Sequence, residues 1–314
     1  MVPAVRQRGL QCTACLPRHA DATDYEPAHL NTTTVSRRIA LAAVPVAVAA
    51  VPSLSGQASA DGDAVLLYVR PGPDDVSGGT YGSIADALAA APPGATVRVA
   101  PGFYNERLII LQAVTLEAEP PKAGAPAGKS AVTLSHDTEA PYEATLQVEA
   151  PDVSVRGIQI RHTSPSIAAN YAVLVRSTGA LTLDKCDARS STGSGLGVEG
   201  GLAIARLCIF TECQRHGVAL YGDLLGSVAG TTVLEDCTLA SNKEDGVLLR
   251  AGADAAIRGC TITGNGGVGI MAVDSSLNLL GCEVRGNRKG ALKVERARSF
   301  DVETTALDAP PVIV

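Results

Sequence analysis

The chain has 314 residues, of which 46% are hydrophobic and only 3% aromatic, and it contains no tryptophan. This length is sufficient for a large buried core, and the composition predicts a core built from small and branched side chains. The formal net charge of −6 and the lack of a basic stripe argue against nucleic acid as a partner.

Residues 1–60 have the pattern of a targeting presequence. Arg37 and Arg38 precede an apolar run over residues 39–54, and small residues close the segment at Ala60. A basic start, an apolar middle and a small-residue end form an export signal. Because the apolar run is short and contains two prolines, we predict contact with a membrane only during import, and no permanent transmembrane helix.

The paired arginines resemble the twin-arginine signals that carry folded proteins across a membrane. Ahead of them lies a leader rich in arginine, threonine and alanine. A leader followed by such a signal resembles the bipartite presequence of thylakoid-lumen proteins, so the resemblance implies a location in the chloroplast thylakoid lumen. Export from a bacterial cell by a twin-arginine route stays open as the alternative.

Residues 61–110 are predicted to form an N-terminal cap and the first coil of the fold. Apolar residues at helical spacing predict a short helix over residues 84–91, which a Pro-Pro-Gly sequence ends. Two strands follow, over residues 96–100 and 107–110, with a turn between them at residues 101–106.

The predicted helix and the turn Pro101-Gly102-Phe103-Tyr104-x-Glu106 resemble the N-terminal capping segment of pectin methylesterases and other pectin-lyase-like β-helix proteins. The resemblance implies a β-helix whose open end is covered by a short amphipathic helix. Such a cover is needed because an open end exposes apolar side chains and unpaired strand edges.

Residues 111–314 are predicted to form the β-helix repeats, and their first part is the least regular. Strands are predicted over residues 114–117, 132–134 and 145–148. Loops that interrupt the repeat are predicted over residues 122–129, 163–169 and 221–231.

Residues 181–294 repeat one pattern five times, with a cysteine in the same slot, a polar turn, and then a small residue that opens an alternating apolar stretch. Successive cysteines are 22, 29, 23 and 22 residues apart, and a period in this range is typical of a solenoid. Apolar residues alternate at spacing two, so the repeats are strands. The sequence therefore predicts an all-β fold, a single-stranded right-handed parallel β-helix with a short N-terminal capping helix. The cysteine slot defines a predicted structural ladder: Ile158, Cys186, Cys208, Cys237, Cys260, Cys282 and Thr305.

The stacked cysteines are interpreted as small buried hydrophobic residues that take the place of an asparagine ladder. Neighbouring coils at about 4.8 Å also place cysteines within range of a disulfide. No zinc motif follows Ala60, so we predict no metal and no cofactor. Cys213 falls in a polar turn, where its thiol is expected to be accessible.

The strands after each small residue are predicted to present one outward face. Its apolar members would form a patch rimmed by charged residues, and such patches usually contact another molecule. We therefore predict a non-catalytic binding or scaffold protein with a protein or glycan partner on this face. The predicted binding face consists of Tyr221, Leu248, Arg250, Met271, Val273 and Lys293.

A polysaccharide-active enzyme is the alternative that the family resemblance implies, either a pectin-lyase-like enzyme or a polygalacturonase-like hydrolase. The resemblance would imply an acidic cluster on this face for a lyase and a tryptophan for a pectin methylesterase, and the face has neither. His216, Glu244 and Asp245 resemble hydrolase motifs on adjacent coils and are the candidate catalytic residues. Glu244 and Asp245 are sequence neighbours, so their side chains are expected to point to opposite sides of an extended strand.

Overall fold

The computed structural model describes residues 65–120, 131–165, 170–222 and 230–314. The predicted presequence, with Arg37, Arg38 and Ala60, lies outside the described residues, as do the predicted loop at 122–129 and parts of the other two loops. The described residues belong to one compact unit, Asp61–Val314. Within them, no helix is long and apolar enough to cross a membrane.

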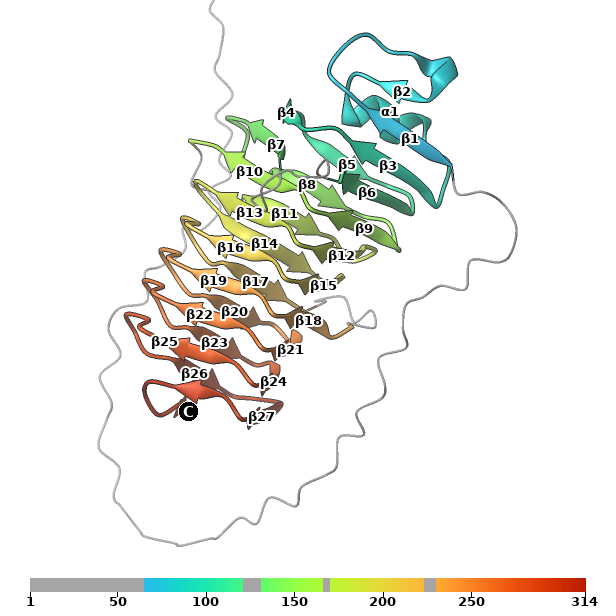
Figure 1. Cartoon of the computed structure of the whole chain (residues 1–314). Coiled ribbons are helices and arrows are strands. Elements are labelled where there is room, and N and C mark those ends of the chain that lie inside the picture. Colours follow the sequence, from blue (N-terminus) through green and yellow to red (C-terminus); the bar gives the residue numbers. More distant parts are fainter. Residues whose placement is uncertain (1–64, 121–130, 166–169, 223–229) are drawn as a thin grey trace, which may run out of the picture. The chain divides into compact units, whose positions relative to one another are not determined.

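The chain folds into three parallel sheets that wind around one interior, and this confirms the predicted all-β solenoid (Figure 1). From β3 onward each coil contributes one strand to each sheet, so hydrogen-bonded neighbours are three strands apart in sequence order, whereas β1 and β2 extend the first sheet within the cap. The first sheet has 11 strands in the order β2 (Thr80–Tyr81), β1 (Leu66–Val69), β3 (Ala95–Val99), β6 (Val114–Ala118), β9 (Val153–Arg156), β12 (Ala180–Asp184), β15 (Leu202–Arg206), β18 (Thr232–Glu235), β21 (Asp254–Arg258), β24 (Ser276–Leu280) and β27 (Ser299–Glu303).

The second and third sheets have nine strands each, and the candidate site lies at the turns that connect them. The second sheet runs in the order β4 (Gly102–Asn105), β7 (Val132–Asp137), β10 (Gln159–Thr163), β13 (Asp187–Ser190), β16 (Ile209–Thr211), β19 (Thr238–Ala240), β22 (Thr261–Thr263), β25 (Glu283–Arg285) and β28 (Ala306–Leu307). The third sheet runs in the order β5 (Leu108–Ile110), β8 (Ala144–Val148), β11 (Tyr171–Val175), β14 (Ser194–Glu199), β17 (Val218–Tyr221), β20 (Val247–Arg250), β23 (Ile270–Val273), β26 (Leu292–Glu295) and β29 (Val312–Ile313).

The predicted capping helix is α1 (Ile84–Ala90), and the first coil holds it at both ends. The Glu106 carboxylate accepts hydrogen bonds from the backbone N–H groups of Ile84 and Ala85, at 3.0 and 2.8 Å. At the other end, the Gln112 amide donates to the Ala91 carbonyl oxygen at 2.6 Å. These side chains satisfy backbone groups that a helix end leaves without partners. A short 3₁₀ helix, Val76–Gly78, lies within the same cap.

The turn predicted over residues 101–106 is wrong in part. Residues Gly102–Asn105 form strand β4, which pairs along its length with β7. Pairing with the next coil outweighs the turn preference of the Pro-Gly sequence that opens the segment.

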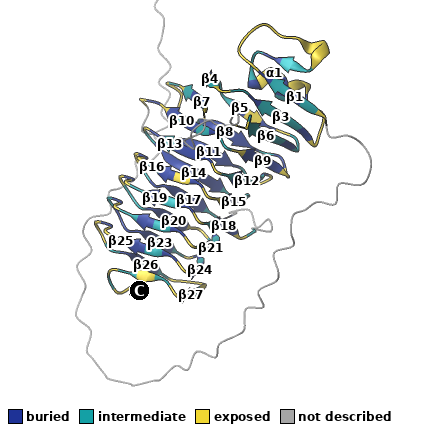
Figure 2. Cartoon of the chain, viewed as in Figure 1, coloured by how far each residue is buried: buried dark blue, intermediate teal, exposed yellow. Residues whose placement is uncertain are grey.

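The cysteine slot is a continuous internal column at the turn between the first and second sheets. Cys186, Cys208, Cys237, Cys260 and Cys282 are all buried, and all are free thiols. Each thiol lies near backbone carbonyl groups of its own or the preceding coil, as Cys237 Sγ does with the Ala205 oxygen at 3.4 Å. Ile158 is buried at one end of the column, and the Thr305 hydroxyl accepts from the Cys282 N–H at 3.4 Å at the other. Figure 2 shows this buried interior running through the stacked coils.

An asparagine column also exists, at the turn between the second and third sheets, so the cysteines do not take its place. Asn242, Asn265 and Asn287 are buried and hydrogen bonded from coil to coil. Cys213 heads this column, and its N–H donates to Asn242 Oδ1 at 3.0 Å. The prediction of an accessible Cys213 thiol is therefore wrong. The thiol is buried, and burial raises its pKa to about 11.

The asparagine column explains why a glycine precedes each of the strands β17, β20 and β23. A Cβ atom at Gly246 would lie 2.9 Å from Asn265 Nδ2 and 2.6 Å from the Gly269 carbonyl oxygen. Only a residue without a side chain lets the asparagine amide approach the next coil so closely.

Candidate functional site

The outward residues of the third sheet align in two columns along the solenoid. One column contains Ala219, Leu248, Met271 and Lys293, and the other contains Tyr221, Arg250, Val273 and Glu295. All six residues of the predicted binding face therefore point to the same side of the third sheet. Their exposure differs from the prediction, however.

Leu248 was predicted to face solvent, but it is only 3% exposed. Its neighbour Ala219 is buried as well, in a small cluster with Ala144, Tyr171 and Leu174 on the outer face. Met271, Val273, Lys293 and Tyr221 are half-buried, and Arg250 is exposed. The outer face therefore offers a much smaller apolar patch than the sequence pattern predicted.

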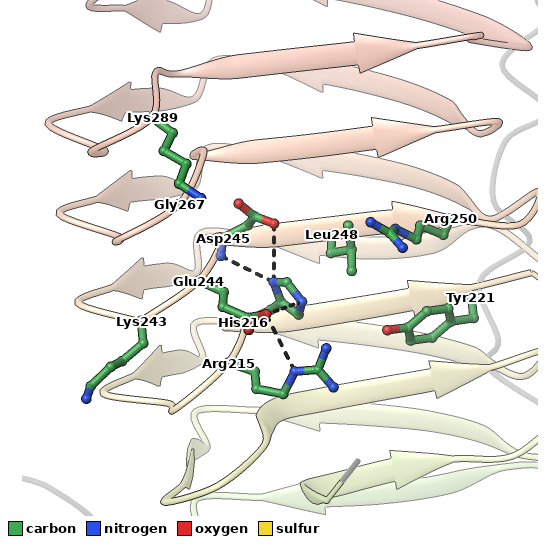
Figure 3. Close-up of a pocket in the computed structure, with 10 residues that line it drawn as sticks. All are labelled: Arg215, His216, Tyr221, Lys243, Glu244, Asp245, Leu248, Arg250, Gly267 and Lys289. Atoms are coloured by element: carbon green, nitrogen blue, oxygen red, sulfur yellow. Dashed lines mark hydrogen bonds and ion pairs between the residues drawn. The ribbon is translucent and has the colours of Figure 1, made fainter. Parts of the chain in front are cut away.

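Leu248 instead forms the floor of a cavity of about 300 Å³, named here the cationic pocket (Figure 3). Its side chains come from the turns that enter β17, β20, β23 and β26 and from the far ends of β17 and β20. The lining residues are Arg215, His216, Tyr221, Lys243, Glu244, Asp245, Leu248, Arg250, Gly267 and Lys289. Stacking of successive coils brings these residues together although they span more than seventy positions of the sequence.

His216 lies between both candidate carboxylates at the edge of this pocket. Its Nε2 atom is 2.9 Å from Glu244 Oε2, and its Nδ1 atom is 3.3 Å from Asp245 Oδ2. The Asp245 N–H also points at Nδ1, at 3.2 Å. A neutral ring with its proton on Nε2 donates to the Glu244 carboxylate and accepts from the backbone N–H of Asp245. A protonated ring can donate to both carboxylates.

The prediction that Glu244 and Asp245 point to opposite sides is wrong. Both residues precede β20 in a bend, where the alternation of an extended strand does not apply. Asp245 is fixed in this bend because its Oδ1 atom accepts from the Val268 N–H of the next coil, at 2.7 Å. The two side chains converge on one imidazole ring as a result (Figure 3).

The carboxylates favour the charged form of His216. Burial lowers the pKa of the ring, but the hydrogen bonds and charges of Asp245 and Glu244 outweigh burial and raise the pKa above its ordinary value. The hydrogen bond from His216 lowers the pKa of Glu244, and the nearby Arg215 guanidinium, at 3.5 Å, acts in the same direction.

The pocket as a whole is positive. Arg215, Lys243, Arg250 and Lys289 face two carboxylates, which gives 4 − 2 = +2 with His216 neutral. Among the residues that the structure describes, no carboxylate lies within 4.0 Å of Lys243, Arg250 or Lys289. Three cations that have no ion-pair partner in the described part of the chain therefore line one cavity, in a protein whose net charge is −6. An anion is the ligand that such a site attracts.

Sequence reasoning missed Arg215, Lys243 and Lys289 as site residues. All three lie in the polar turns that enter strands of the third sheet, and none belongs to the outward strand columns from which the binding face was predicted. Arg215 and Lys289 stand in the same slot of their turns, two positions before the small residue that opens the strand, and this recurrence is the signal that the sequence contains. No group of three metal-ligating side chains occurs within the described ranges.

Comparisons with known proteins support the fold. The profile of the family described as "Right handed beta helix region" matches residues 146–306. No significantly similar sequence was found among curated proteins.

Two pectin methylesterases and one tailspike are among the solved structures that resemble this chain. A pectin methylesterase from Aspergillus niger has 16% sequence identity and a TM-score of 0.52, over 81% of this chain and 93% of that one. A pectin methylesterase from Erwinia chrysanthemi has 14% identity and a TM-score of 0.48, over 78% and 82%. A tailspike of the Acinetobacter baumannii bacteriophage Fri1, a capsular polysaccharide depolymerase, has 11% identity and a TM-score of 0.49, over 70% and 45%. At these identities the similarity shows the fold alone.

Proposed function

The chain belongs to the right-handed β-helix family, and from this premise we propose that it is a non-catalytic binding protein that holds an acidic glycan in the cationic pocket. The observation that carries the proposal is that three cations lining one cavity, Lys243, Arg250 and Lys289, have no ion-pair partner among the residues that the structure describes. A cavity lined by several charges of one sign raises the local concentration of ions of the opposite sign, which favours an anionic ligand.

A sugar ring with an anionic group fits both chemical parts of the pocket. Tyr221, which is half-buried, offers apolar surface to the C–H face of a ring. Arg250 and Arg215 can each make two parallel hydrogen bonds to a carboxylate or sulfate, and a lysine ammonium adds a point charge. The volume of about 300 Å³ lies at the lower end of ligand pockets, which suits one or two sugar rings.

The arrangement around His216 favours binding over cleavage. The residue is only 5% exposed, and both ring nitrogens already have partners within the protein. A general base needs a free lone pair within reach of the proton that it removes. Asp245 is held by Val268 as well as by His216, which leaves Glu244 as the accessible carboxylate.

Polysaccharide cleavage is the second candidate, and the half-exposed Glu244 is the observation that favours it. Its side chain is 46% exposed and lines the pocket beside His216. In this alternative Glu244 would transfer a proton to or from the sugar, and His216 would set the charge of the Glu244 carboxylate. Glycoside hydrolysis requires a second carboxylate free to act on the sugar or on water, and Asp245 is the remaining one.

Titration calorimetry with polygalacturonate tests the binding proposal. Changing Lys289 to glutamate should weaken binding at least tenfold, because it replaces an attractive charge with a repulsive one at the ligand. Arg285→Glu is the matched control, since Arg285 is exposed on the second sheet outside the pocket and the net charge changes equally. Equal binding by both variants would reject the pocket as the site.

A cleavage assay separates the two candidates. The wild-type protein, incubated with the same polymer with and without calcium, should release no new reducing ends and no unsaturated ends. Cleavage that is lost in a Glu244→Gln variant would establish the enzyme in place of the binding protein.

Delivery is part of the same proposal. Residues 1–60, with the twin-arginine pattern at Arg37 and Arg38, would carry the protein into the thylakoid lumen, or out of the cell if the source is bacterial.

A further inference from the structure

We infer that protonation of His216 controls how tightly the cationic pocket holds an acidic glycan, so that binding takes up a proton and strengthens as the pH falls. The inference rests on the proposed function and names the regulation of that same site. Three features of the structure carry it: the ring lines the pocket, two carboxylates face its nitrogen atoms, and Arg215 shares one of these carboxylates.

His216 lies in the turn that enters β17 and is one of the residues that line the pocket (Figure 3). Protonation of the ring therefore adds one positive charge to the pocket lining. Opposite charges at short range attract, so an anionic ligand binds the protonated pocket more tightly than the neutral one. The coupling is reciprocal, and a bound anion must favour the protonated ring to the same extent.

Both ring nitrogens of His216 face a carboxylate oxygen. Nε2 lies 2.9 Å from Glu244 Oε2, and Nδ1 lies 3.3 Å from Asp245 Oδ2. Either neutral tautomer presents a lone pair to one of these oxygens, and only the protonated ring donates to both. Asp245 is held in place because its Oδ1 atom accepts from the Val268 N–H at 2.7 Å. Burial opposes the charged ring, but the two carboxylates outweigh burial and hold the pKa of His216 above its ordinary value.

The charged and titratable groups that line the pocket with His216 are Arg215, Tyr221, Lys243, Glu244, Asp245, Arg250 and Lys289. The preceding coil meets His216 with Ser194 and Gly195, which carry no charge. Imidazole is the only side chain whose ordinary pKa lies between pH 5 and 8. The hydrogen bond from His216 lowers the pKa of Glu244, and burial raises the pKa of Tyr221, so both pKa values move away from neutrality. His216 is therefore the pocket group whose charge changes near neutral pH.

Glu244 connects the charge of the ring to a cation of the pocket. Its Oε2 atom lies 2.9 Å from His216 Nε2 and 3.5 Å from Arg215 Nε, so both groups compete for one oxygen. A protonated ring holds this oxygen through a charge-assisted hydrogen bond, which leaves the Arg215 guanidinium available to the ligand. A neutral ring holds it less strongly, and Arg215 then interacts more with Glu244. Loss of the proton thus removes one positive charge from the pocket and engages a second.

Calorimetry in two buffers measures the proton directly. Oligogalacturonate is titrated into the full chain in Tris and in Bis-Tris, because these amine buffers differ in their heat of ionisation and do not compete for an anion site. The difference in binding enthalpy gives the number of protons taken up per ligand. We expect uptake of a fraction of one proton, and an affinity that falls roughly threefold or more between pH 6 and pH 8.5. The carboxylates of the probe stay ionised over this range.

The outcomes separate the inference from the proposed function. Equal affinity at both pH values without proton uptake would overturn the inference and leave the proposed function intact. No binding at either pH would reject the proposed function, and the inference with it.

His216→Gln tests the residue. Glutamine keeps a donor toward Glu244 but takes up no proton, so the variant should bind without proton uptake and with an affinity that does not change over this pH range. His136→Gln is the matched control, because His136 also faces a carboxylate, that of Glu143 at 3.1 Å, and lies outside the pocket. The control should keep the proton uptake of the wild type.

Proton uptake that persists in a folded His216→Gln variant would overturn the inference, since another group would then carry the proton. Circular dichroism verifies the fold of the variant. If the variant does not fold, NMR titration of the His216 ring in the wild type, with and without oligogalacturonate, decides the inference. The ligand should raise the pKa of the ring, and a pKa unchanged by the ligand would overturn the inference.

Discussion

Replacing Asn265 with alanine should strongly destabilise the solenoid, because this residue occupies the middle of the buried asparagine column. Its Oδ1 atom accepts from the N–H of Asn242 at 3.0 Å and from Asn242 Nδ2 at 2.9 Å. Its Nδ2 atom donates to the Leu239 carbonyl oxygen at 3.1 Å and to Asn287 Oδ1 at 2.8 Å. One side chain thus connects three successive coils.

The magnitude follows from these four hydrogen bonds. Each contributes about 1 kcal/mol net, and a buried group that loses its partner costs about 1–3 kcal/mol. The variant leaves the Asn242 N–H and the Leu239 carbonyl oxygen without their side-chain partner, so we expect a loss of roughly 4–6 kcal/mol in the free energy of unfolding.

Urea unfolding followed by circular dichroism measures this loss. Asn278→Ala is the matched control, since Asn278 is exposed in the same part of the solenoid and makes a single long hydrogen bond to Asp301, at 3.5 Å. The control should change the free energy of unfolding by less than about 0.5 kcal/mol. A loss below about 1 kcal/mol for Asn265→Ala would refute the argument that the column carries stability.

Three further predictions concern the thiols, the imidazole and the presequence. Cys213→Asp and Cys260→Asp should both prevent cooperative thermal unfolding, because each buries a carboxylate without a partner; a cooperative transition in either variant would contradict the burial found for that thiol. Because the pKa of His216 is raised in the folded protein, its ion pairs stabilise the fold fully below about pH 6.5. This stabilisation is lost as the pH rises through the raised pKa. Denaturation over pH 6–9 should therefore show a decline in stability that a His216→Gln variant lacks. A reporter fused to residues 1–60 should enter isolated thylakoids, and changing Arg37 and Arg38 to lysine should block entry; unchanged import would refute the twin-arginine interpretation.

The register of the solenoid could be predicted from sequence because stacking repeats the same chemistry at the same slot. Cysteine and glycine positions alone aligned the coils, and the strand pairs Ala219–Leu248 and Leu248–Met271 follow that alignment. Inward and outward residues of the strands were predictable for the same reason, since side chains alternate along a strand.

The site was less predictable because it lies in the turns. Glu244 and Asp245 leave the strand geometry in a bend, so alternation gave the wrong directions for their side chains. Leu248 points outward as predicted but is buried by its surroundings, which a periodic pattern does not describe. Cys213 has the local sequence of a polar turn, and its burial results from hydrogen bonding to Asn242, 29 residues further along the chain.

The asparagine column also bears on how such a chain can change in length during evolution. Asn242 and Asn265 are related by 23 residues and Asn265 and Asn287 by 22, and each pair makes the same two contacts to the acceptor Oδ1 atom. Successive interfaces between coils are thus chemically equivalent. A duplicated coil could be inserted between two existing ones, with each new surface meeting the partner that it already fits. An insertion of any other length within the strands would displace both the asparagine and the cysteine columns, so growth or loss by whole coils is the change that this architecture tolerates.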